Sequence, residues 1–575
     1  MLRALLRLTY DLLRAPFWPL WLLFRWMGRP RGNWVHARIA DGLSEIDEPA
    51  PPWSPLARFV PALRRRRPTS VRAVARLVDA LLADPGRVGL LVEIHGLPAG
   101  WAKVDALRAE LARLRRGGKK VAVYLPNGGG NKELFLASVA DRVIATEGAA
   151  FFVTGVGATS RYLKGLLDKV GVSVEVYRRA AYKTAAESVS EEAMSEPQRE
   201  QVGALLDAFD RALVAALAER PGLDEAKVRA LFERGAASGQ AAIDAGLVDA
   251  HAFEDELPRA LGADGKLVAA GAYLARADAK FFLPLWPRPY VAIVPVHGAI
   301  GDGGTGRGAS RAALVPTLRR VARDRRALAV VLHVDSPGGS ALSSDLIHRE
   351  VQLLAERKPV IACFGDVAAS GGYYVAAPAS AIVASRVSIT GSIGVISARL
   401  VASSLLDRLG VRTEVLRRAP HADMMTNPRP ADEAERAILD REVDAFYRTF
   451  VAVVAKGRKR SEEEVEPLAR GRVWSGADAL ERGLVDRQGT LADAIALAKE
   501  KLTALPPAAR EALRAVTVAP QDGDEAPLEA DGKDGARSAL ALLASTLDDD
   551  VAFLARAATG NERAMYYALG VPKID

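Results

Sequence analysis

The chain has 575 residues, 49% of them hydrophobic and 26% charged, so we expect a folded protein of two or three domains. Its net charge of +8 comes mostly from arginines spread along amphipathic segments, which indicates solvated helix faces and argues against a nucleic-acid partner. The single cysteine, Cys363, excludes a disulfide within the chain, and no Cys/His spacing is typical of a metal site, so we expect neither a metal nor a cofactor.

Residues 1–27 are very apolar but match a membrane-spanning helix poorly. Charged side chains recur every three or four positions and would share one face of a helix, opposite a face of leucines. The longest uncharged run, 15–24, is shorter than the roughly 20 residues that cross a bilayer. The pattern predicts a membrane-associated amphipathic and aromatic segment over 1–30, lying in the membrane interface. The alternative is a helix docked on the protein's own core. The charged residues are Arg3, Arg7, Asp11 and Arg14.

Residues 31–85 are predicted as a lead-in, which is irregular until folded structure begins near Val71. A strand over 88–94, a helix over 104–114 and a strand over 121–125 follow. Strands that alternate with a helix in this way are typical of a βαβ unit in a parallel sheet. We therefore expect an α/β fold from here on.

The order of the first half recurs in the second half at a nearly fixed spacing. The sequence thus predicts an internal duplication, with an N-terminal repeat over 86–280, a C-terminal repeat over 288–505 and a partly disordered tail over 506–575. The matched segments are 97–100 with 336–339 and 171–179 with 410–418, both 239 positions apart, and 246–249 with 483–486, 237 apart.

The second repeat contains a serine in a setting typical of a nucleophile. An apolar strand over 360–364 stops at Gly365 and Asp366, and Ser370 then precedes a predicted helix, where free amide groups lie beside its Oγ. A second strand, over 327–334, leads into a Pro-Gly-Gly turn. An amide of this turn together with the amide after the serine suits an oxyanion hole. The alternative is a glycine-rich turn without chemistry. The candidate amides belong to Gly338, Gly339 and Gly371.

The motifs DSPGGS at 335–340, AASGGYY at 368–374 and ITGSIGV at 389–395 resemble the signal peptide peptidases of the protease IV type, in their long, two-repeat form. The resemblance covers roughly residues 86–505. It implies two tandem ClpP/crotonase-like repeats of stacked ββα units and an endopeptidase acting on hydrophobic peptides such as remnant signal peptides. It also implies attachment to the bacterial inner (cytoplasmic) membrane, with lipid bound by residues 1–27, and a homo-oligomer, a tetramer in that family.

Ser370 needs a base, because a hydroxyl is a weak nucleophile at neutral pH. Three histidines of the second repeat are candidates, but each fits a structural role in a strand, helix or turn. Lys183 follows a predicted strand among small residues, and the matching stretch of the second repeat has no lysine. At the spacing of 239, Asn131 matches Ser370, so each repeat has kept what the other has lost. The three histidines are His297, His333 and His348.

In the resembled family, a lysine in a Tyr-Lys-Ser/Thr-Ala setting is the general base of a Ser–Lys dyad, and Lys183 stands in this setting here. The same family pattern implies that Ser392 holds the lysine amine. The amine can act as a base only if its pKa falls from about 10.4 toward 7–8. Burial and the neighbouring Arg178 and Arg179 should lower it. The rival interpretations are a crotonase-like acyl-CoA enzyme, which needs no serine–lysine pair, and a catalytically inactive membrane scaffold.

Overall fold

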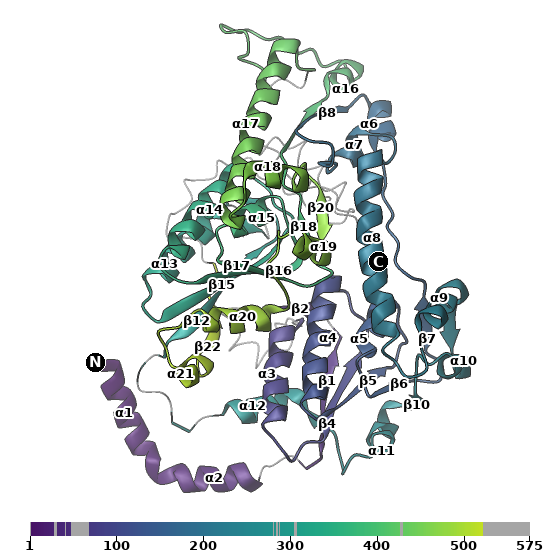
Figure 1. Ribbon diagram of the computed structural model, residues 1–575, viewed down its shortest axis with the longest axis vertical. Coiled ribbons are helices and arrows are strands. Elements are labelled where there is room, and N and C mark those ends of the chain that lie inside the picture. Colours follow the sequence, from purple (N-terminus) through teal and green to yellow (C-terminus); the bar gives the residue numbers. More distant parts are fainter. Residues whose placement is uncertain are drawn as a thin grey trace.

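The protein is described by a computed structural model in which two α/β repeats lie one above the other, the second repeat uppermost in Figure 1. The predicted disorder in the tail falls after residue 520 and lies outside the described residues. The structure describes residues 2–27, 31–40, 42–47, 68–279, 281–282, 286, 288–303, 308–425 and 429–520.

The first repeat is built on a six-stranded sheet whose neighbouring strands are all parallel. Every residue of its strand β4 is buried, as expected where helices cover both faces of a sheet. The helices α3 (Val71–Leu82) and α4 (Trp101–Arg116) pack into the core of this repeat. The strand order is β10 (Ala250–His251), β6 (Arg142–Ala145), β5 (Lys120–Leu125), β4 (Gly89–Ile94), β1 (Trp34–Ile39) and β11 (Val268–Ala269).

The prediction of an irregular lead-in is wrong for β1, which lies inside this sheet between β4 and β11. Val35 and Ile39 of β1 are fully buried, but the strand is short and the partner β4 lies about fifty residues further along the chain. A pairing of this kind depends on tertiary contacts that local periodicity does not reveal. The first repeat therefore begins at Trp34 and not at residue 86.

The second repeat contains an eight-stranded sheet. Its central strands β12 (Tyr290–His297), β15 (Ala327–Ser336) and β16 (Val360–Ala369) are parallel. The predicted end of β16 at Gly365 is wrong, because the strand continues through a bulge to Ala369. The repeat also reaches beyond residue 505, since β22 pairs with β12. The other strands are β17 (Ala381–Ala384), β18 (Ile389–Gly391), β20 (Val473–Ser475), β21 (Arg487–Gln488) and β22 (Arg514–Thr517).

The two repeats share one topology, which confirms the internal duplication. The strand sequence β1, β4, β5, β6 and β10 of the first repeat corresponds to β12, β15, β16, β17 and β21 of the second, with the same parallel neighbours. Each repeat then adds an antiparallel pair. These pairs are β7 (Ala150–Val153) with β9 (Gly235–Ser238), and β18 with β20.

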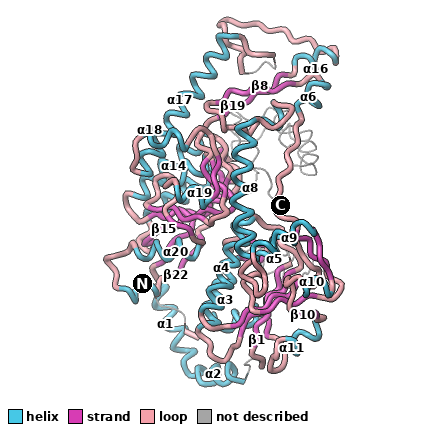
Figure 2. The backbone as a smooth tube through the Cα atoms, turned by 45° about the vertical axis from the view of Figure 1, so that its right-hand side comes forward, coloured by secondary structure: helices cyan, strands magenta, loops and turns pink. Residues whose placement is uncertain are grey.

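The repeats are also joined by strand pairing far from both main sheets. Strand β8 (Ser173–Arg178) of the first repeat pairs antiparallel with β19 (Ile396–Val401) of the second, at the top of the view in Figure 2. The long helix α8 (Glu196–Leu217) follows β8 in the chain and runs from this end of the molecule back to the first repeat. The segment between β8 and α8, which contains Lys183, therefore lies against the second repeat.

The N-terminal segment forms two helices at the outer edge of the molecule (Figure 1). They are α1 (Leu2–Arg14) and α2 (Trp18–Met27), joined by a short 3-10 turn over Ala15–Phe17. Large apolar side chains of both helices are exposed, whereas Asp11 is buried. Among the described residues, no helix combines the length and the apolarity needed to cross a bilayer.

Candidate active site

Ser370 lies at the point where β16 ends and the helix α15 (Gly371–Ala376) begins. Its φ of 53° is unusual for a residue with a side chain, and such strained positions cluster at functional sites. The turn that follows β15 presses against it. A Cβ added at Gly338 would lie 2.8 Å from Ser370 Cβ, so only glycine allows this approach.

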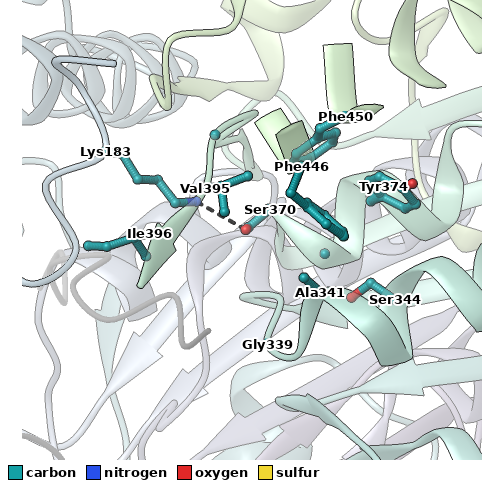
Figure 3. Close-up of a pocket in the computed structure, with 12 residues that line it drawn as sticks. Lys183, Gly339, Ala341, Ser344, Ser370, Tyr374, Val395, Ile396, Phe446 and Phe450 are labelled. Atoms are coloured by element: carbon teal, nitrogen blue, oxygen red, sulfur yellow. Dashed lines mark hydrogen bonds between the residues drawn. The ribbon is translucent and has the colours of Figure 1, made fainter. Parts of the chain in front are cut away.

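Lys183 reaches Ser370 from the first repeat, as Figure 3 shows. Its side chain is buried, and its Nζ lies 3.0 Å from Ser370 Oγ. The same Nζ lies 2.8 Å from Ser392 Oγ and donates to the Ser392 carbonyl oxygen at 3.0 Å. The three residues singled out from the sequence therefore meet within one chain, although 187 positions separate Lys183 from Ser370.

Burial lowers the pKa of Lys183 from its ordinary 10.5 to about 7. The expected contribution of the two neighbouring arginines is not supported. Arg178 pairs with Glu187 at 2.8 Å, and Arg179 pairs with Asp444 at 2.9 Å, so carboxylates balance both charges. Desolvation of the amine alone accounts for the shift.

The loop that carries Lys183 is held closely against the second repeat. A Cβ added at Gly471 would lie 2.6 Å from Lys183 Cβ, and the φ of Gly471 is +75°. The amide of Tyr182 donates to the carbonyl of Arg470, and Gln201 donates to Thr184 Oγ1 at 2.7 Å. No local pattern in the sequence points to Gly471, because its importance depends on the docking of a loop from the other repeat.

The oxyanion-hole prediction needs one correction. The amide of Gly338 donates to Ser336 Oγ at 3.1 Å and so is already occupied. The amides of Gly339 and Gly371 have no acceptor among the described residues, and both glycines line the pocket at Ser370. A Cβ at Gly371 would lie 3.4 Å from the Gly339 nitrogen, so the two amides are neighbours. They are the pair that can bind one oxygen atom.

The pocket beside Ser370 has mostly apolar walls. Two phenylalanines of α17 (Glu433–Arg458) lie beside Tyr374 in Figure 3, and the ring centroids of Tyr374 and Phe450 are 4.9 Å apart. The sequence did not single out these phenylalanines, because α17 reads as an ordinary amphipathic helix. The apolar lining residues are Ala341, Tyr374, Val395, Ile396, Phe446 and Phe450.

The histidines considered as bases lie away from Ser370. His297 and His333 contact each other, with 2.7 Å between Nε2 and Nδ1, and His348 packs 5.0 Å from the Tyr374 ring. None of the three lines the pocket.

The predicted counterpart of Ser370 in the first repeat is wrong by one residue. Gly130, and not Asn131, precedes the helix α5 (Asn131–Ala137) in the way that Ser370 precedes α15. Neither residue has a hydroxyl.

Comparison with known proteins places this fold and site in a family. The family model described as "Peptidase family S49" matches residues 113–267 and 352–505, one segment in each repeat. The chain belongs to peptidase family S49. The two matches and the two related sheets confirm the predicted fold class of tandem α/β repeats, and the family confirms the resemblance to protease IV.

Two relatives of this S49 chain illustrate the extent of the similarity. The chloroplastic serine protease SPPA of Arabidopsis thaliana is 33% identical over 73% of this chain and 64% of its own length. Protease 4 of Salmonella typhi is 32% identical over 64% of this chain and 62% of its own length. This chain thus matches less than two thirds of each. A solved ClpP1 mutant from Listeria monocytogenes aligns with 35% of this chain and 93% of its own, at 14% identity and a TM-score of 0.22.

Proposed function

We propose that the chain is a serine endopeptidase in which Lys183 is the general base for Ser370. The observation that carries the proposal is the 3.0 Å contact between Ser370 Oγ and the amine of a buried lysine whose pKa is lowered to about 7. Half of such an amine is neutral near pH 7, where an ordinary lysine is almost wholly protonated. Membership of a peptidase family supports the same conclusion.

The surroundings of the amine suit this role. A neutral amine has two hydrogens and one lone pair, and Lys183 Nζ has three neighbouring oxygens. When its hydrogens point to the carbonyl and hydroxyl oxygens of Ser392, the lone pair is left for the Ser370 hydroxyl proton. Ser392 thereby orients the base, which is the role that the family pattern implied for it.

In the proposed reaction, Lys183 takes the proton of Ser370 while Oγ bonds to the carbonyl carbon of the peptide. The negative charge then develops on the carbonyl oxygen, where the amides of Gly339 and Gly371 can donate to it. Lys183 next returns the proton to the leaving amine as the C–N bond breaks. A water molecule, activated by the same lysine, releases the acyl group from Ser370.

The proposed substrates are hydrophobic peptides such as remnant signal peptides. An apolar side chain of the substrate would bind against the apolar wall of the pocket, which includes Phe446 and Phe450, because both apolar surfaces would then be removed from water.

We also propose that residues 1–27 bind lipid at the bacterial inner membrane. The exposed Leu12, Leu13 and Phe17 of the N-terminal helices support this interface position.

We further propose that the chain forms a homo-oligomer, as the family resemblance implied. Strand β8 has its partner β19 within the chain, but its counterpart in the duplication, residues 411–417, forms no strand and exposes Leu416 almost completely. A second copy could supply the missing strand. The same pairing repeated between copies would close a ring, which would be a tetramer as the resemblance implies.

The decisive experiment compares Ser370→Ala and Lys183→Met with the wild type on an apolar peptide substrate. Both variants should lose hydrolysis and keep the wild-type circular dichroism, because each change is small and internal. Labelling of Ser370 by a serine-hydrolase probe separates a peptidase from the two rival interpretations. Substantial hydrolysis by either folded variant would contradict the proposed dyad, and a wild type inactive on every peptide would favour the scaffold.

A further inference from the structure

A partly buried group of charges joins the two repeats just before Ser370. Lys103, in the first turn of α4 of the first repeat, places Nζ 2.7 Å from the Asp335 carboxylate and 2.6 Å from the Asp366 carboxylate. The backbone amide of Lys103 also donates to Asp366 at 3.2 Å. A Cβ at Gly100 would overlap the Asp366 carboxylate, so a glycine at the start of α4 lets the carboxylate approach.

Both carboxylates belong to a bulge between the two strands that carry the proposed chemistry. Val334 pairs with Phe364 and Ser336 pairs with Ala368, so Asp335 alone faces the three residues 365–367. The Asp335 carboxylate accepts the Val367 amide at 3.2 Å. A bulge fixes the register of the residues that follow it. Here these are Ser370 on one strand and the glycine turn on the other.

Two carboxylates that contact the same ammonium group would repel each other if that cation were removed. Burial raises the pKa of Asp366, whereas the ammonium of Lys103 outweighs burial and keeps the pKa of Asp335 low. Lys103 is itself held charged, because the carboxylates raise its pKa against the effect of burial.

Within the described ranges, the other titratable groups near the carboxylates cannot replace this lysine. Burial lowers the pKa of His297 to about 3, so it is neutral at working pH. Burial lowers the pKa of His333, but the Glu45 carboxylate outweighs burial and raises this pKa above its ordinary value. His333 Nε2 lies 2.8 Å from the Glu45 carboxylate. The His333 charge is therefore balanced by Glu45. Lys103 remains as the cation in contact with both aspartates.

The first repeat provides an internal comparison. When the helix starts are matched, Gly100 with Ser340 and Gly130 with Ser370, the repeats are 240 positions apart. His95 and Pro126 then occupy the positions of Asp335 and Asp366, and Ser343 occupies that of Lys103. The pairing of β4 with β5 runs without a register shift. The charged bulge is therefore absent from the described part of the repeat that lacks the nucleophile. It accompanies the serine and is not a requirement of the fold.

We propose that Lys103 is a positioning residue, whose charge holds the bulge closed so that Ser370 stays aligned with Lys183 and the paired amides. This inference rests on the proposed peptidase function. The first repeat would then supply two lysines with opposite requirements, since Lys183 must be neutral to act and Lys103 must stay charged.

The test replaces Lys103 with methionine, which keeps the length of the side chain but not the charge. A misplacement of the nucleophile by about 1 Å can lower the rate about 100-fold, so kcat of Lys103→Met should fall by about that factor with KM little changed. Lys164→Met, which removes an exposed lysine paired with Asp168, is the matched control and should keep wild-type kcat.

The second arm is rescue. Adding Asp366→Asn to Lys103→Met removes one of the repelling charges, and kcat should recover at least tenfold. The pH profile provides a separate readout. In Lys103→Met, rising pH should ionise the second carboxylate and lower the activity again, so that the curve of kcat against pH is bell-shaped. In the double variant, kcat should only rise with pH. A residue needed merely for folding would lower activity equally at every pH and would not be rescued.

Wild-type kcat in Lys103→Met, or a double variant no better than the single one, would overturn the inference. If Lys103→Met does not fold, an active double variant supports the inference, and an inactive or unfolded one overturns it. Ser370→Ala and Lys183→Met are assayed in parallel. Activity in those variants would mean that the proposed dyad is wrong, whereas their inactivity beside a wild-type Lys103→Met would refute the role of Lys103 alone.

Discussion

Replacing Ser392 with aspartate should move the pH at which the enzyme becomes active. Ser392 has a φ of 50°, a conformation that aspartate and asparagine tolerate better than most residues, and its Oγ lies 2.8 Å from Lys183 Nζ. A carboxylate at this position would stabilise the protonated lysine, which cannot accept the Ser370 proton. The uncharged Ser392→Asn is the matched control for the loss of the hydroxyl.

The size of the effect follows from the charge and the distance. An adjacent opposite charge shifts a pKa by about one to three units, so the pKa of Lys183 should rise from about 7 to about 9. At pH 7 the neutral fraction of the amine would then fall from about one half to about one hundredth, a loss of about 50-fold in kcat/KM. Activity should return as the pH rises through 9.

The assay is kcat/KM for an apolar peptide between pH 6 and 10, measured for the wild type and both variants. The wild type should rise with a midpoint near 7, because deprotonation of Lys183 creates the base. Ser392→Asn should be slower but keep this midpoint. Parallel curves for Ser392→Asp and Ser392→Asn would refute the reasoning, since they would show that the titrating group does not sense a charge at this position.

Three further predictions concern other parts of the molecule. Lys183→Arg should be inactive at every pH from 6 to 10, because a guanidinium stays protonated, and measurable peptide hydrolysis would exclude the dyad. Deletion of residues 1–27 should abolish co-sedimentation with anionic lipid vesicles and leave peptide hydrolysis intact; a truncated protein that still binds vesicles would place the lipid contact elsewhere. Leu416→Glu should shift the chain to a smaller species in analytical ultracentrifugation, and an unchanged sedimentation coefficient would contradict pairing between copies through residues 411–417.

The sequence was most informative where one short stretch contains all the determinants of a structure. The turn at Ser370 was predictable because an apolar strand, a run of small residues and a helix follow one another directly. Lys183 could be found because the duplication supplied a second copy that lacks it. The signal for Ser370 is therefore a local pattern, and the signal for Lys183 is a difference between the two repeats.

The features that escaped prediction depend on contacts between distant segments. Strand β1 is recognisable only through its pairing with β4, and Gly471 matters only because a loop of the other repeat lies against it. The bulge at Asp335 requires Lys103 from the first repeat, which no local pattern connects to it. Lys103 alone reads as one more solvated lysine near the start of an amphipathic helix.

The division of the site between the repeats has a consequence for the newly made protein. Lys183 emerges from the ribosome before Ser370, and the second repeat must fold and dock before the two side chains can meet. With the proposed base and the proposed nucleophile on separate repeats, no unfinished or half-folded chain would contain the complete pair. Proteolysis would begin only after the whole molecule has assembled, so the chain would need no propeptide to protect its neighbours during synthesis.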